Sequence, residues 1–349
     1  MVGFWARQIS DLRRTRNFLW GIFGDLWNKP QFGPMTDDAH SSQPTTTPPG
    51  RVFIAGASGM LGRDLVQAFV ARGWYVVSPF RDQFNIGHRN HLETLRKGDW
   101  GQFDWVINAA AYTQVDQAET HIAEAERANH IGAGLLAFAA QEIGARFVHF
   151  STDFVFDGLT DKPYREDDPT NPLGIYGRSK RHGEEAVLRE HPSAVVMRTS
   201  WLFGQHGRSF PRTMIEAWRA GKNLRVVADQ TGRPTYTPDL AARIVDLVTL
   251  APSPGIIHLA GPDVMTWHQF AVQTIQAFAT VTGDSRPVEI EAIPTSAWPT
   301  PAKRPMYSVL DLAKSESLGL APMRTMTEAL VEFGSLIAKE LSVAREPAE

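Results

Sequence analysis

A short apolar strand that leads into a glycine-rich turn and then into a helix constrains the fold of this chain more than any other stretch. Residues 51–55 have a strand pattern and residues 63–72 a helical pattern. Between them, Gly56 would form a tight turn, Gly59 would let the backbone approach a pyrophosphate, and Gly62 would allow close helix–strand packing. The spacing is G-x-x-G-x-x-G rather than G-x-G-x-x-G. The stretch predicts a dinucleotide site, with a purely structural glycine turn as the alternative.

The next two predicted strands end in residues that suit the rest of a dinucleotide. The strand at 74–78 leads to Arg81, and an arginine there suits a 2′-phosphate, which favours NADPH. A solvated surface arginine is the alternative. The neighbouring Asp82 would suit the 2′-hydroxyl of NADH, so NADH is an alternative cofactor. The strand at 105–108 leads to three alanines, past which a cofactor could run close to the backbone. The predicted cofactor-binding residues are Gly56, Gly59, Met60, Leu61, Gly62, Arg81, Ala109, Ala110 and Ala111.

Tyr176 and Lys180 form the candidate catalytic pair. Four residues apart on a helix, they share one face, so the ammonium would lower the pKa of the phenol from its ordinary value of about 10. Thr152 closes an apolar strand at 146–151, which places its hydroxyl at the carboxyl edge of the sheet, where open α/β folds bind ligands. A hydroxyl, a phenol and an ammonium are what reduction of a carbonyl beside a nicotinamide requires. Alone, a Tyr-x-x-x-Lys match carries little weight, because many surface helices contain one by chance.

Strands alternate with helices up to about residue 200, which predicts an α/β fold with a Rossmann-type, doubly wound parallel sheet. The alternation then loosens, which predicts a smaller C-terminal lobe that binds substrate. We therefore expect one domain at 51–335, with the cofactor part mainly at 51–200 and the substrate lobe mainly at 201–335, followed by a tail at 336–349. Within the first part, helical patterns at 116–127 and 130–143 are interrupted near Asn129.

Residues 1–50 do not resemble the rest of the chain. The first thirty combine aromatic residues with arginines, and the next twenty are polar and rich in Pro and Thr. We interpret this stretch as a flexible leader without the h-region or cleavage site of a signal peptide. Its first part would otherwise be an amphipathic helix that binds a surface or a partner. If Met35 is the true start, residues 1–34 are a start-site artefact.

Composition narrows the classes of function. The 349 residues are 43% hydrophobic and 21% charged, which is ordinary for a globular protein. A net charge of -3 gives no reason to expect nucleic acid or an anionic membrane as partner, and no apolar run reaches the ~20 residues of a membrane span. The chain has no cysteine, which excludes disulfides, thiolate metal sites and cysteine nucleophiles and agrees with a cytoplasmic location.

Several ordered motifs together resemble the extended short-chain dehydrogenases/reductases, and within them the dTDP-4-dehydrorhamnose reductase family. The resemblance covers roughly residues 51–335. It rests on the motifs GASGMLG, INAAAYTQVDQAE, STDFVFDG, YGRSK, RTSWLFG, DQTGRPTYTPDLA, HLAGPDVMTWHQFA and RPMYSVLD.

The resemblance implies roles for residues beyond the catalytic pair. Thr152, Tyr176 and Lys180 would be catalytic, and Asn129 matches an asparagine that helps to hold the lysine through water. The residues implied to lie near the substrate are Thr113, Val115, Phe154 and Trp201 for the deoxysugar and Arg304 for the nucleotide end. Trp201 could equally be core packing, and Asp116 and Glu119 would cap a helix behind the cofactor site.

Related enzymes of the same fold do other chemistry. Sugar-nucleotide 4,6-dehydratases have a glutamate after the Asp that follows the threonine, whereas here Asp153 is followed by Phe154, which disfavours water elimination. Epimerases have small residues at this place. The reductase family more often has tyrosine at position 154, so the missing hydroxyl leaves fine specificity open.

The implied activity is NADPH-dependent reduction of the C4 keto group of dTDP-4-dehydro-L-rhamnose to dTDP-L-rhamnose, in deoxysugar biosynthesis for cell-surface polysaccharide. A reductase of another nucleotide 4-keto-6-deoxysugar is one alternative. A non-catalytic regulatory subunit of the same fold is the other, although the intact catalytic set favours an enzyme. A homodimer is compatible with the resemblance. Some family members use Mg2+ at a dimer contact, but no carboxylates for it can be located. His149 and His182 lack metal-ligand spacing, so we expect no metal site.

Overall fold

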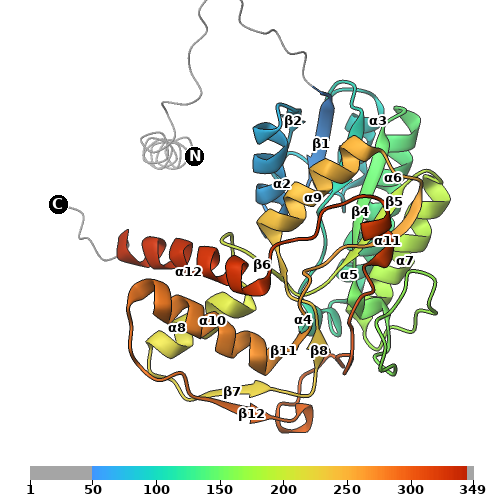
Figure 1. The fold of residues 1–349 in the computed structure, drawn as a ribbon. Coiled ribbons are helices and arrows are strands. Elements are labelled where there is room, and N and C mark those ends of the chain that lie inside the picture. The colour runs from blue at the N-terminus through green and yellow to red at the C-terminus, as the bar shows by residue number, and fades with distance from the viewer. Residues whose placement is uncertain (1–48, 344–349) are drawn as a thin grey trace, which may run out of the picture. The chain divides into compact units, whose positions relative to one another are not determined.

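The centre of the protein is a six-stranded parallel sheet. The structure is a computed structural model, and it describes residues 49–343 (Figure 1). The strands lie in the order β10-β5-β4-β3-β1-β2, and every neighbouring pair is parallel. They span Arg51–Ala55 (β1), Tyr75–Val77 (β2), Trp105–Asn108 (β3), Arg146–Thr152 (β4), Val195–Thr199 (β5) and Gly255–His258 (β10).

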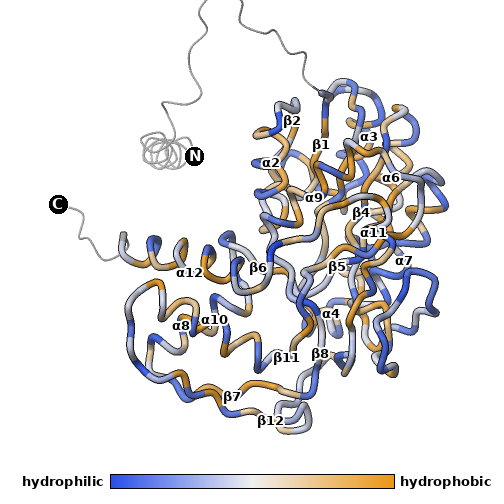
Figure 2. Tube along the Cα trace, in the orientation of Figure 1, coloured by the Kyte–Doolittle hydropathy of each residue, from blue (hydrophilic) through white to orange (hydrophobic). Residues whose placement is uncertain are grey.

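Helices cover both faces of this sheet, because successive strand residues point to opposite sides. Val52 and Ile54 of β1 pack under α2 (Met60–Ala71) and α9 (Thr237–Leu250). Phe53 lies on the other face, under the group α3 (Arg89–Arg96), α6 (Ala133–Glu142) and α7 (Ile175–Glu190). The central strands are buried and mainly hydrophobic, as expected for strands covered on both faces (Figure 2). The predicted doubly wound α/β fold is confirmed.

A second, smaller core lies in the C-terminal part of the chain. Its aromatic centre includes Phe203, Phe270 and Phe333, which meet edge to face with centroids 5.3 to 5.6 Å apart. Its elements are α8 (Phe210–Arg219), α10 (Trp267–Thr282) and α12 (Met326–Val343), with the paired strands β7 (Leu224–Val227) and β12 (Ile290–Ile293). Short strands pair at its border, β6 (Leu202–Phe203) with β9 (Thr235–Tyr236) and β8 (Thr231–Gly232) with β11 (Met265–Thr266).

The division between sheet and lobe is less simple than a boundary near residue 200. After building part of the lobe, the chain returns to the sheet, where α9 covers one face and β10 pairs with β5. A strand pattern does not reveal which sheet a strand joins, so the periodicity at 201–335 could not indicate this return. Helix α12 also runs through the predicted boundary at residue 335. The predicted leader at 1–50 falls almost wholly outside the described residues.

The predicted interruption near Asn129 is a π-helical turn. Helices α4 (Val115–Ala118) and α5 (Ile122–Glu126) precede it, and η1 (Arg127–Gly132) joins α5 to α6. Such turns occur frequently at functional sites. The remaining elements are the short helices η2 (Asp153–Val155), η3 (Thr295–Ala297) and α11 (Ala313–Ser317). Among the described residues, no helix has the length and apolar character needed to cross a membrane.

Candidate active site

The glycine turn after β1 has the geometry that its sequence suggests. Gly56 has a φ of +82°, and a Cβ there would lie 2.5 Å from the backbone nitrogen of Ala110. A Cβ on Gly62 would lie 2.2 Å from the carbonyl oxygen of Gly56, so only glycine lets α2 pack this closely on the turn. At Gly59 the nearest atom would be 3.3 Å away, so packing alone does not require glycine there.

The N-terminus of α2 suits an anionic group. Gly59 is its N-cap, no side chain caps it, and its first turn holds no acidic residue, so the helix dipole and its N–H groups are available to an anion. A hollow beside it is lined by Gly59, Met60 and Thr113, together with the cationic side chains of Arg63 and Arg208. Small backbone-exposing residues and positive charge are what a dinucleotide pyrophosphate needs, so this part of the chain fits such a cofactor.

Arg81 lies in the loop that follows β2, where the adenosine side of a dinucleotide would end. It lines a hollow that also includes Ser58 of the glycine turn, Asn85, His88 and His91. Ser58 also borders the hollow at the α2 N-terminus, so the two hollows adjoin. The arrangement agrees with the predicted role of Arg81 toward a 2′-phosphate, which stays a prediction.

Thr152 and Tyr176 meet at the carboxyl end of β4. Thr152 is the last residue of β4, and Tyr176 lies in the first turn of α7. Burial raises the pKa of the Tyr176 phenol to about 12, although a hydrogen bond with Thr152 acts in the opposite direction. The phenol is therefore protonated at neutral pH, as a proton donor must be.

Lys180 does not act on the phenol as the sequence suggested. Its Nζ donates a hydrogen bond of 2.5 Å to the carbonyl oxygen of Phe150 and lies 3.4 Å from Nε2 of His149. Burial lowers the pKa of Lys180 to about 8. The prediction that Lys180 lowers the pKa of Tyr176 is wrong for the chain by itself. The ammonium bonds to β4, and burial has the largest effect on the pKa of the phenol and raises it.

Asn129 ties three parts of the site together. Its Oδ1 accepts a hydrogen bond of 2.8 Å from the backbone nitrogen of Tyr112, and its Nδ2 donates to the carbonyl oxygen of Tyr112 and to Ser179 Oγ, each at 3.0 Å. Ser179 is the neighbour of Lys180 on α7. Asn129 thus fixes the segment after β3, which carries the three alanines, against α7, which carries the candidate pair Tyr176 and Lys180.

Asp153, directly after Thr152, is a buried carboxyl whose Oδ2 has no hydrogen-bond partner among the described residues. Burial raises its pKa to about 6, while hydrogen bonds from Ser308 and Thr152 act against the rise. The folded state therefore binds more protons than the unfolded state between about pH 4 and 6, and this group's contribution to stability falls as the pH rises through that window.

Asp153→Asn should accordingly be more stable than the unchanged protein at pH 7.5 and should lose most of that advantage near pH 4.5. A shift of this size corresponds to roughly 2–3 kcal/mol at most. The free energy of unfolding, measured in urea at the two pH values, checks this. An equal difference between the proteins at both pH values would contradict it.

The predicted substrate residues lie in several different parts of the structure. Phe154 packs edge to face with Tyr176, with the two ring centroids 5.7 Å apart. Thr113 borders the hollow at the α2 N-terminus, and Val115 begins α4. Trp201 stacks on Trp267 of the lobe at 3.6 Å, which supports the core-packing interpretation for that residue.

Arg304 is engaged by Asp116. The guanidinium forms a bidentate ion pair with the carboxylate, at 3.0 and 2.9 Å, and also donates to the Thr300 hydroxyl. This ion pair links α4 to the segment before Tyr307, which forms a β-bridge with Thr231. The Asp116 carboxylate therefore binds Arg304, and the expectation that it caps a helix is wrong. Glu119 does cap a helix, but that helix is α7, because the Glu119 carboxylate accepts a 2.8 Å hydrogen bond from the backbone nitrogen of Ile175 at its start.

Two buried groups that support the site were not predicted from the sequence. Arg198 of β5 and Glu184 of α7 form a bidentate ion pair with both contacts at 2.8 Å, and their side chains are 2% and 0% exposed. His149 of β4 lies between Asn108 and Lys180, and burial keeps its pKa well below the usual value. The available signals were an arginine inside the apolar strand β5 and a glutamate four residues after Lys180.

His182 is not isolated, contrary to the expectation from the sequence. Its Nδ1 lies 3.0 Å from the Glu126 carboxylate, which also contacts His130 at 2.9 Å. Glu126 and His130 are neighbours on one helical stretch, whereas His182 comes from α7, which sequence spacing could not place beside them.

Comparison with known proteins agrees with this geometry. A protein of Streptomyces antibioticus named probable dTDP-4,6-dihydroxy-2-methyloxan-3-one 4-ketoreductase is 40% identical, over 83% of this chain and 97% of its own. The dTDP-4-dehydrorhamnose reductase of Mycolicibacterium smegmatis is 38% identical, over 80% and 84%. The crystal structure of dTDP-4-dehydrorhamnose reductase from Bacillus anthracis in complex with NADP superposes with a TM-score of 0.75 at 32% identity, over 81% and 98%.

The RmlD substrate binding domain matches residues 50–338. This span begins one residue before β1 and ends inside α12, so it contains the glycine turn, α7 and most of the lobe. The chain therefore belongs to the RmlD substrate binding domain family.

Proposed function

We propose that the protein reduces the C4 keto group of dTDP-4-dehydro-L-rhamnose to dTDP-L-rhamnose with NADPH, in deoxysugar biosynthesis. The observation that carries the proposal is the contact between Thr152 and Tyr176 at the carboxyl end of β4, with Lys180 held by the Phe150 carbonyl on the same strand and with the uncapped N-terminus of α2 in the same domain. Two relatives that this chain matches over 80% and 78% of its length are named as dTDP-4-dehydrorhamnose reductases, which supports the same activity.

The nicotinamide cofactor supplies the hydride, and the chain's own groups manage charge and protons. Tyr176, protonated at neutral pH, would donate its proton to the carbonyl oxygen as negative charge develops there. Thr152 would hydrogen-bond the same oxygen. Lys180, held by the Phe150 carbonyl, would supply positive charge beside the nicotinamide ribose. Asn129 would act as a positioning residue through Ser179 and Tyr112.

The test is oxidation of NADPH and of NADH by purified protein. The substrate is made in situ from dTDP-glucose by the preceding dehydratase and epimerase. We expect rapid oxidation with dTDP-L-rhamnose as the product. Cofactor binding without oxidation of any nucleotide 4-keto sugar would contradict the proposal and favour the regulatory-subunit alternative.

Arg81→Ala should weaken the use of NADPH and leave NADH nearly unaffected. Arg81 lies exposed beside the turn, and a charged hydrogen bond to a 2′-phosphate at such a site accounts for about a tenfold change in KM. The measurement is kcat/KM for both cofactors with the same keto sugar. NADH lacks the phosphate and is the internal control, so a parallel loss with both cofactors would refute this role.

A related substrate is the second candidate, because Phe154 replaces the tyrosine more often found at this position and its ring faces Tyr176. The Streptomyces antibioticus relative, named as a 4-ketoreductase of another dTDP sugar, also supports this candidate. Comparison of kcat/KM for dTDP-4-dehydro-L-rhamnose with that for dTDP-4-keto-6-deoxy-D-glucose decides between them.

A further inference from the structure

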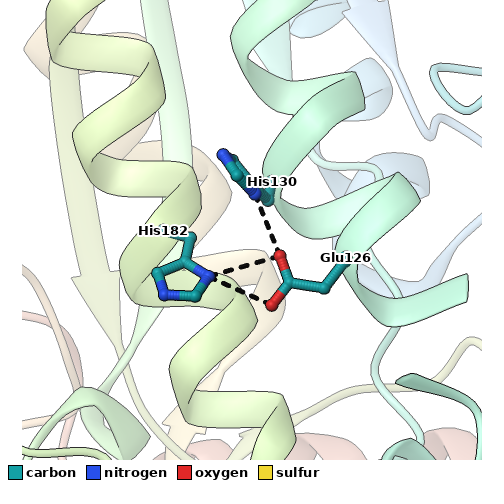
Figure 3. Close-up of side chains that lie close together, drawn as sticks. All are labelled: Glu126, His130 and His182. Atoms are coloured by element: carbon teal, nitrogen blue, oxygen red, sulfur yellow. Dashed lines mark hydrogen bonds and ion pairs between the residues drawn. The ribbon is translucent and has the colours of Figure 1, made fainter. Parts of the chain in front are cut away.

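Two histidines and one glutamate converge on the surface between η1 and α7 (Figure 3). Glu126 ends α5, His130 lies in η1 and His182 lies in α7. Nδ1 of His130 is 2.9 Å from Glu126 Oε2, and Nδ1 of His182 is 3.0 Å from Oε1 and 3.3 Å from Oε2. Both imidazoles thus present the same ring atom to one carboxylate.

The three donor atoms are placed as metal ligands are. One atom from each residue lies within 4.8 Å of the others. Zinc bonds of about 2 Å place tetrahedral ligand atoms about 3.4 Å apart, so small side-chain rotations suffice to enclose an ion. Two imidazoles and one carboxylate are a donor set that suits zinc and its neighbours in the first transition row. Mg2+ prefers oxygen ligands and would not select this set.

The backbone holds the donors together before any ion binds. Glu126 and His130 are four residues apart on a continuous helical stretch, which places both on one side. Across from them, Gly183 touches the backbone of η1 directly, because a Cβ there would lie 2.0 Å from the carbonyl oxygen of Asn129. His182 directly precedes Gly183, so this backbone contact places the His182 ring beside Glu126 and His130.

The cluster is accessible to an ion from solvent. The side chains are 23% exposed for Glu126, 34% for His130 and 39% for His182. An ion bound there would keep room for water in its remaining position, as in three-ligand sites. It would also cross-link η1, which carries Asn129, to α7, which carries Lys180.

We propose that Glu126, His130 and His182 form a binding site for one divalent transition-metal ion of the zinc class, which joins η1 to α7. The site is separate from the reductase machinery, and its existence does not depend on the proposed function. Its expected effect is on the stability of the contact between these two elements, because an ion bound only to the folded state stabilises that state.

The experiment uses the full chain without a histidine tag, freed of metal with a chelator. Zn2+ is titrated by calorimetry, and Co2+ is added separately to follow its visible absorption. We expect one equivalent of Zn2+ to bind and to raise Tm, Co2+ to give a ligand-field spectrum, and Mg2+ to do neither. His130→Gln and His182→Gln should each weaken Zn2+ binding at least about tenfold and abolish the Co2+ spectrum.

The matched control is His88→Gln, which removes an exposed histidine outside the cluster and should bind Zn2+ as the unchanged protein does. Circular dichroism and Tm without metal show whether each variant is folded. If one of the two ligand variants does not fold, the other still tests the site. The proposal is overturned if no stoichiometric binding occurs. It is also overturned if both ligand variants bind normally, or if His88→Gln weakens binding as much as they do.

Discussion

Tyr176→Phe is expected to lower kcat by about 10²- to 10⁴-fold, because it removes the proton donor and leaves the ring in place. The phenol, whose pKa burial raises to about 12, is the group that holds a transferable proton beside Thr152 at neutral pH. The ring itself packs edge to face with Phe154, and phenylalanine preserves that contact. The measurement is steady-state NADPH oxidation with the nucleotide keto sugar.

Cofactor binding separates a chemical defect from a folding defect in this variant. The Kd for NADPH should change little, because the residues proposed to bind the cofactor lie in the glycine turn, α2 and the segments after β2 and β3. The phenol hydroxyl of Tyr176 is not one of these proposed contacts. Tyr75→Phe, at the exposed start of β2, is a matched control and should keep full activity. Unchanged turnover in Tyr176→Phe would remove the tyrosine from the mechanism, and loss of NADPH binding together with turnover would indicate misfolding.

Glu184→Ala is expected to destabilise the protein by about 3–5 kcal/mol, because it leaves the Arg198 guanidinium buried without its counter-charge. The pair joins α7 to β5, and Arg198 also lies 5.0 Å from the ring centroid of Phe156. The free energy of unfolding in urea measures the effect. Since α7 carries the two residues that we propose as catalytic, Tyr176 and Lys180, the variant should lose activity at urea concentrations well below the denaturation midpoint of the unchanged protein.

The adjacent residue provides the control. Glu185 pairs with Arg181 at 2.8 Å on the exposed side of the same helix, and such surface pairs contribute about 0–1 kcal/mol. Glu185→Ala should therefore be nearly neutral. Replacement of both buried partners, as in Glu184→Leu with Arg198→Met, should recover much of the lost stability. Equal destabilisation at positions 184 and 185 would show that the buried pair contributes no more than the surface pair.

The sheet was predictable because its strands are short apolar runs between glycine and helix patterns. The predicted strands at 51–55 and 105–108 coincide with β1 and β3. The π-turn at η1 was also visible, as a break in two helical patterns around Asn129. These features depend on local sequence, which periodicity measures directly.

Features that depend on contacts between distant segments were not predictable. Nothing near Arg198 indicates that its partner is Glu184, and nothing near His182 points to Glu126. The orientation of Lys180 failed for a related reason. Helical spacing places it on the same face as Tyr176, but the carbonyl oxygen of Phe150, on a different element, determines where the ammonium points.

The late return of β10 to the sheet has a consequence for protein synthesis. The strand that covers the outer edge of β5 is made only after residues 200–254 have been translated. Until then the nascent chain presents β5 as an open edge, which is a site where other strands can add. A fragment that stops near residue 200 would keep this edge and lack α9, so we expect it to aggregate rather than to fold as an independent cofactor-binding module.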